Sequence, residues 1–147
     1  MDTAATPFKT MGVIAIIAAG LIAAAIAHHP TQPMVWMVAY LVLVTGVVQY
    51  ALGTGQSALT ARPLAMSIVW GQWLLLNLGH AGVIGGTLLS SLGMLILGTV
   101  LYDLAMLWFA WSARSGMSGL RRTGYWLLIT VMMASSLIGI ALSQFGK

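Results

Sequence analysis

The chain has 147 residues, of which 60% are hydrophobic and only 5% carry a charge. Soluble domains carry charges on about a quarter of their residues, so this composition excludes a water-soluble globular domain and indicates a lipid solvent. The six bases and two acids give a formal net charge of +4. The bases are scattered between apolar runs, which favours membrane topology over nucleic-acid binding. The chain has no cysteine, which excludes disulfides, thiolate metal sites, iron–sulfur clusters and cysteine nucleophiles.

The first apolar segment, residues 10–27, follows Lys9 and is predicted to be the first membrane span. A basic start, an apolar core and a small-residue ending are also typical of a secretory signal peptide, so cleavage of residues 1–27 is the alternative. Pro33 suits the first turn of a helix and predicts a second span over residues 34–52. The glycine- and serine-containing segment 53–57 predicts a loop after that span.

The next apolar stretch, residues 64–113, contains a single charged residue, Asp103. As one helix it would be about 75 Å long, whereas the hydrocarbon core of a bilayer is about 30 Å thick. The stretch therefore has to reverse, and the glycine-rich segment 79–86 is the predicted reversal. This division gives a third span over about residues 64–82 and a fourth over about residues 87–113.

The last apolar run predicts a fifth span over residues 125–143, so residues 1–147 are expected to form one all-α transmembrane domain of five helices. The positive-inside rule then predicts a cytoplasmic N-terminus and an external C-terminus, in what we expect to be a bacterial inner membrane. Lys147 lies on the external side of this arrangement, and the other five bases lie on the cytoplasmic side: Lys9, Arg62, Arg114, Arg121 and Arg122.

Asp103 is the only acid inside a predicted span. An ionised carboxylate in hydrocarbon is costly, so the group is expected to be neutral or held by a partner. Gln72, at a similar predicted depth, is the expected hydrogen-bond partner. A proton relay, an ion pathway and a hydrogen bond to a quinone are the functional interpretations. A structural hydrogen bond or a wetted residue near the inner interface is the alternative.

Trp73, Asn77 and His80 are spaced four and three residues apart, so they share one helix face. A stripe of this kind is unfavourable against lipid and is expected to face protein or a cavity. It serves either interhelical hydrogen bonding or a pathway for a ligand.

The three histidines, His28, His29 and His80, are all predicted to lie at the outer ends of helices. Imidazole binds copper, zinc and haem iron, so these residues are the candidate ligands for copper or haem. The spacing matches no specific motif, and a histidine cluster at the membrane interface without any ligand is the alternative.

Small residues recur at every fourth position in two predicted spans, which permits close approach between helices of one chain or of two copies. These residues are Ala15, Ala19, Ala23 and Ala27, and Ser135, Gly139 and Ser143.

The leading functional interpretation is a small non-enzymatic membrane protein that acts by binding, as a homo-oligomer or as an accessory subunit of a larger membrane complex. A second is an oligomeric channel or transporter that uses Asp103, Gln72 and Asn77. A third is a membrane redox protein that binds haem, copper or quinone. A lipid-modifying enzyme is the most distant alternative, because one acid and three histidines offer few catalytic groups.

Overall fold

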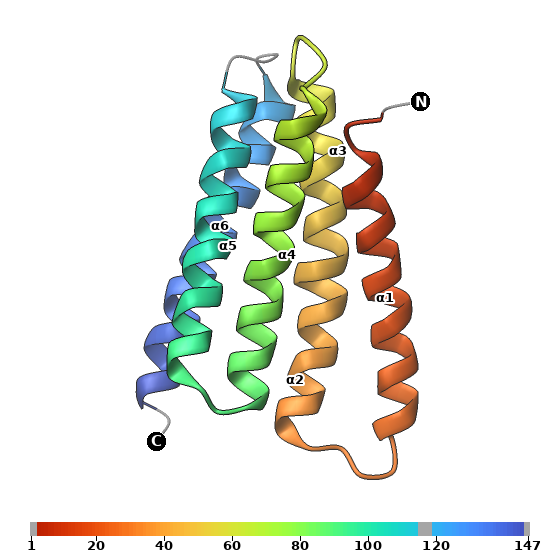
Figure 1. Ribbon diagram of the computed structural model, residues 1–147, viewed down its shortest axis with the longest axis vertical. Helices are drawn as coiled ribbons and strands as arrows, with labels where there is room; N and C mark the ends of the chain where they lie inside the picture. Colours follow the sequence, from red (N-terminus) through yellow and green to blue (C-terminus); the bar gives the residue numbers. More distant parts are fainter. Residues whose placement is uncertain (1–2, 115–118, 146–147) are drawn as a thin grey trace. The chain divides into compact units, whose positions relative to one another are not determined.

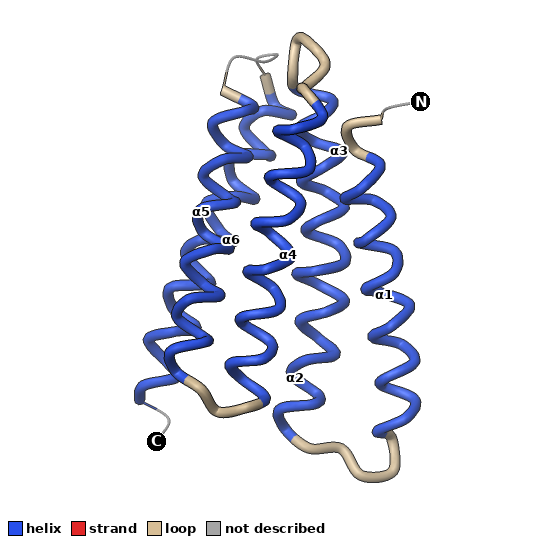
Figure 2. Tube along the Cα trace, viewed as in Figure 1, coloured by secondary structure: helices blue, strands red, loops and turns tan. Residues whose placement is uncertain are grey.

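The computed structural model describes residues 3–114 and 119–145, with no side chains described at 143–145. Every regular element within these ranges is a helix, and none is a strand, which confirms the all-α prediction (Figures 1 and 2). Four helices are long and apolar enough to cross a membrane. The chain divides into two compact units, Met1–Ala58 and Leu59–Lys147.

Unit 1 is a helical hairpin. Its first helix, α1, covers Thr6–Ile26. The second is continuous and is built from three consecutive elements: α2 (Gln32–Tyr40), η1 (Leu41–Val48) and α3 (Gln49–Leu59). Pro33 lies in the first turn of α2, as predicted. The element η1 is a π-helix, and the Gln49 N–H just after it donates to the carbonyl five residues earlier, on Val44.

Glycines allow the two helices of unit 1 to approach each other closely. A Cβ at Gly12 would lie 2.7 Å from the Gly46 carbonyl oxygen, and one at Gly53 would lie 2.5 Å from the Phe8 Cβ. The predicted loop over residues 53–57 is therefore wrong: the helix continues to Leu59, and Gly53 leaves space for the Phe8 ring. Two residues of the predicted alanine stripe, Ala15 and Ala19, are buried.

Unit 2 contains three helices: α4 (Met66–Leu88), α5 (Leu92–Ala113) and α6 (Leu120–Phe145). Helices α4 and α5 run antiparallel and contact each other along most of their length (Figure 1). Glycine supplies one side of each close approach, because a Cβ there would meet the backbone or ring of the opposite helix. The pairs are Gly71 with Trp108, Gly79 with Tyr102, Gly82 with Gly98, and Gly86 with Leu95.

The reversal between α4 and α5 lies at residues 89–91 rather than in the predicted segment 79–86. Ser90 has a positive φ of 53°. The Ser91 N–H donates to the Gly86 carbonyl at 2.8 Å, and the Ser90 N–H donates to that of Thr87 at 3.3 Å. These bonds form a Schellman motif, the common helix ending with one left-handed residue. The prediction failed because a serine occupies the position at which glycine is usual.

Helix α6 packs against α5 and is the most exposed of the candidate spans. In its most apolar window 11% of the residues are buried, compared with 33% for α5. It begins at Leu120, earlier than the predicted start at residue 125, so Arg121 and Arg122 belong to its first turn.

The glycine packing of unit 2 predicts opposite effects for two matched substitutions in α5. Gly98→Ala places a methyl group against the backbone of Gly82 and Val83, so we expect it to lower the free energy of unfolding by about 1–3 kcal/mol. Gly93 is exposed, with no heavy atom within 4 Å of a Cβ, so Gly93→Ala is expected to be neutral or slightly stabilising. Reversible unfolding in detergent micelles measures both. Equal effects would contradict close packing at Gly98.

Candidate functional site

Asp103 lies on α5, is half-buried and interacts with α6. Its Oδ1 atom is 2.7 Å from the Ser136 hydroxyl oxygen. The same hydroxyl oxygen is also 2.7 Å from the carbonyl oxygen of Met133, three residues earlier in α6. The carboxyl group is therefore held by a side chain that is itself bonded to the helix backbone.

Gln72 does not interact with Asp103 in the way that the sequence predicted. It is fully buried on α4, and its Nε2 donates to the Ser112 hydroxyl on α5 at 3.1 Å. The difference arises from the faces of α5: the side that meets α4 carries Ser112, whereas Asp103 points to the side that meets α6. The two polar residues thus join α5 to two different neighbours.

The predicted stripe on α4 is only partly buried. Trp73 and Asn77 are half-buried, and the Asn77 amide donates to the Trp73 carbonyl oxygen at 2.7 Å. His80 is 3% exposed, and its ring lies 5.5 Å from that of Tyr102 on α5, measured between centroids. The stripe therefore supports the α4–α5 contact at His80.

Tyr102, which lies against His80, was not predicted from the sequence as part of a site. It is 2% exposed, yet its hydroxyl has no hydrogen-bond partner among the described residues. The same holds for Trp73 Nε1 and Asn77 Oδ1. Buried polar atoms are normally paired, so these atoms mark polar positions on α4 and α5 whose hydrogen-bonding capacity is unused among the described residues. The signal that the sequence offered for Tyr102 was its position directly before Asp103, the acid inside a predicted span.

The histidines occupy dissimilar positions. His28 and His29 are exposed in the turn after α1. His80 is not at a helix end, as had been expected, because α4 continues to Leu88, about 12 Å further along the axis. Across the described ranges, no group of three or more His, Cys, Asp or Glu side chains could hold a metal ion. Copper or haem binding by these three residues remains a prediction.

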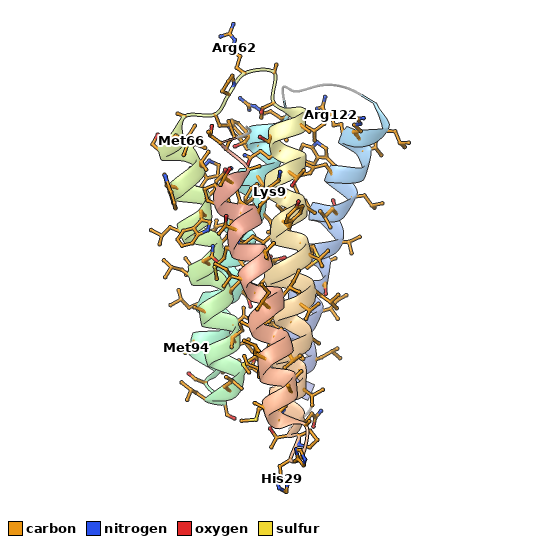
Figure 3. All side chains as sticks on the ribbon, turned by 90° about the vertical axis from the view of Figure 1, so that its right-hand side faces the viewer. Lys9, His29, Arg62, Met66, Met94 and Arg122 are labelled. Atoms are coloured by element: carbon orange, nitrogen blue, oxygen red, sulfur yellow. The ribbon has the colours of Figure 1, made fainter. Side chains whose placement is uncertain are left out.

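Basic residues mark one end of unit 2. Arg62 and Arg122 lie at this end, and Met94 lies toward the opposite end (Figure 3). The Arg114 guanidinium lies over the Trp111 ring, 3.4 Å from its centroid. In unit 1, the Lys9 ammonium is 5.8 Å from the centroid of the Tyr50 ring. Pairs of cations and aromatic rings suit the headgroup region of a membrane. Lys147 lies outside the described residues.

The Gln72–Ser112 bond predicts a measurable contribution to stability. Ser112→Ala removes the acceptor of a buried amide, so we expect a loss of about 0.6 kcal/mol, the average for hydrogen bonds between membrane helices. Ser67→Ala, at an exposed position in the first turn of α4, is the matched control and is expected to change stability less. Unfolding of both variants in detergent tests this. An equal effect of the two substitutions would show that the interhelical bond adds nothing.

Three of the contacts described in unit 2 join polar residues on different helices: Asp103 with Ser136, Gln72 with Ser112, and His80 with Tyr102. The first lies between α5 and α6, and the other two lie between α4 and α5. Only the first contact contains a carboxyl group, which in water is ionised at neutral pH. This carboxyl group, on Asp103, is half-buried. No family model, curated protein or solved structure matches this chain.

Proposed function

We propose that this chain is a small integral membrane protein of five spans that acts by binding, and that it assembles with copies of itself. The observation that supports self-association is that α6 exposes small residues on the side that contacts no other described helix. Gly139 is exposed there, with no described heavy atom within 4 Å of an added Cβ, and Ser135 lies one turn earlier on the same face. We call this pair of positions the α6 small-residue face.

The use of glycine elsewhere in unit 2 supports a helix partner at this face. Gly79, Gly82, Gly86 and Gly98 each leave space for an opposing helix, which compensates for the lower helix propensity of glycine. Gly139 receives no such compensation from the described part of the chain. In lipid, helices associate through close packing of small residues, and an identical helix presents the matching surface.

The contacts of the polar residues favour binding over a shared pathway. Gln72 and Asp103 bond to different helices, and the Asn77 amide bonds to its own helix backbone. A pathway through one protomer would require these three side chains to line the same route. Their separate partners support structural roles for Gln72 and Asn77.

The proposed topology adds α4 to the four candidate spans as a further span, although α4 is less apolar than they are. Its polar residues Gln72 and His80 are buried, so they do not have to face lipid. Helix α4 also contacts α5 from Gly71 to Gly86, which supports a course alongside α5 across the bilayer. The bases at one end of unit 2 favour a cytoplasmic position for that end, in a bacterial inner membrane, with an external C-terminus.

The five-span topology predicts the accessibility of three single-cysteine variants, each of which carries the only thiol in its chain. Ala61→Cys precedes α4, Ser90→Cys lies in the α4–α5 turn and Leu120→Cys begins α6. We expect an impermeant maleimide to label Ser90→Cys from outside and the other two from the cytoplasmic side. Labelling of Ala61→Cys and Ser90→Cys on the same side would show that α4 does not cross.

Self-association predicts selective cross-linking at the α6 small-residue face. Gly139→Cys should form a disulfide-linked dimer on mild oxidation in native membranes. Leu137→Cys is the control, because it is exposed at nearly the same depth but about 200° around the same helix. We expect much less dimer from it. Equal dimer yields at the two positions would indicate random collision, and the absence of dimer at Gly139 would contradict self-association through this face.

A further inference from the structure

The two contacts of the Ser136 hydroxyl limit which groups can donate hydrogen bonds between α5 and α6. Its hydroxyl oxygen is 2.7 Å from both Asp103 Oδ1 and the Met133 carbonyl oxygen. Both distances are typical of complete O–H···O hydrogen bonds. A hydroxyl group has one proton, so it makes a full two-centre hydrogen bond to only one of these oxygens at a time. The other contact needs a proton from a different group.

The carbonyl oxygen of Met133 has no proton to give, so the second proton has to come from Asp103. A protonated carboxyl donates to the Ser136 oxygen, and the Ser136 hydroxyl then donates to Met133. In this row of two hydrogen bonds, the Asp103 carboxyl, the Ser136 hydroxyl and the Met133 carbonyl each have a partner. With an ionised carboxylate, the single Ser136 proton would have to serve both short contacts, which leaves neither with a full hydrogen bond.

Among the described residues of unit 2, no cation lies close enough to Asp103 to hold a carboxylate. On α5 the nearest base along the chain is Arg114, about 16 Å away along the helix axis. On α6, Tyr125, Arg121 and Arg122 lie about 16 Å or more from Ser136 along the axis. Helix α4 contributes His80, whose ring lies against Tyr102, the residue before Asp103. An unpaired carboxylate in hydrocarbon is unfavourable, which agrees with the proton count.

We propose that Asp103 is a reversible proton-binding site within the membrane, and that Ser136 and the Met133 carbonyl complete it. The ligand is a proton: release converts the carboxyl to a carboxylate and passes the proton to water or to another acceptor. The Ser136 hydroxyl then donates to the carboxylate, and the Met133 carbonyl loses its side-chain hydrogen bond. Proton loss therefore rearranges the bonds between α5 and α6. This site does not depend on self-association.

A hydrophobic carbodiimide tests the proposal, because it dissolves in lipid and reacts with protonated carboxyl groups. The carboxyl proton moves to a carbodiimide nitrogen and the carboxyl oxygen bonds to the central carbon, and the adduct rearranges to a stable acylurea. No oxidant or reductant is needed. The chain contains only one other acidic side chain, Asp2, so mass spectrometry of peptides from the full-length protein assigns the site without ambiguity.

We expect dicyclohexylcarbodiimide to modify Asp103 in reconstituted vesicles, with a yield that falls along a single titration as the pH rises. Asp103→Asn should lose this adduct and remain folded, because the amide can donate to Ser136 as the protonated carboxyl does. Gel filtration checks the fold of the variant. Infrared spectra of the wild-type protein should contain a protonated-carboxyl band that shifts in D2O. Absence of both the adduct and the band, or modification of Asp2 alone, would overturn the proposal.

Discussion

Hydrocarbon provides no hydrogen bonds, so polar side chains on membrane helices require partners within the protein. In unit 2 the close approach of α4 and α5 meets this requirement for Gln72, whose amide bonds to Ser112. Glycines at Gly79, Gly82 and Gly98 let the two backbones come together over several turns. The short separation encloses Gln72 and His80 between the helices. Two of the polar residues that lower the apolar character of α4, Gln72 and His80, are thus removed from lipid by its packing.

Helix α6 is joined to this pair in a different way. It has little buried surface, and its described hydrogen bond to α5 passes through Ser136 and Asp103. Consecutive helical residues point about 100° apart, so Ser136 contacts α5 while Ser135 is exposed. One serine therefore belongs to the proposed proton-binding site and its neighbour to the proposed contact with a second copy. Separate surfaces of one helix carry the two proposals.

The all-α membrane fold and the start of the second helix at Pro33 followed from composition and local signals. Other helix boundaries did not, and at two of them tertiary contacts or backbone geometry overrode those signals. Gly53 is typical of a loop, yet it lies within a helix, where its missing side chain leaves space for the Phe8 ring. Ser90 adopts a left-handed conformation that usually identifies glycine.

The candidate site was only partly accessible to sequence reasoning. Asp103 stood out because an acid in a membrane span is rare. Its partner could not be predicted, since depth in the membrane is readable from residue number but the direction of a side chain around its helix is not. Gln72 matched in depth and faced the wrong neighbour, whereas Ser136 on α6 faced the carboxyl group. Tyr102 was missed for the same reason, because only the α4–α5 register brings it to His80.

The short turn at residues 89–91 has a consequence for biogenesis. Helix α4 carries an amide, a second amide and an imidazole at Gln72, Asn77 and His80, each of which opposes transfer of an isolated helix into lipid. Helix α5 is more apolar and follows after only three residues. In the proposed five-span topology, this short tether favours entry of the two helices into the bilayer together, as a hairpin in which the more apolar α5 supplies the driving force.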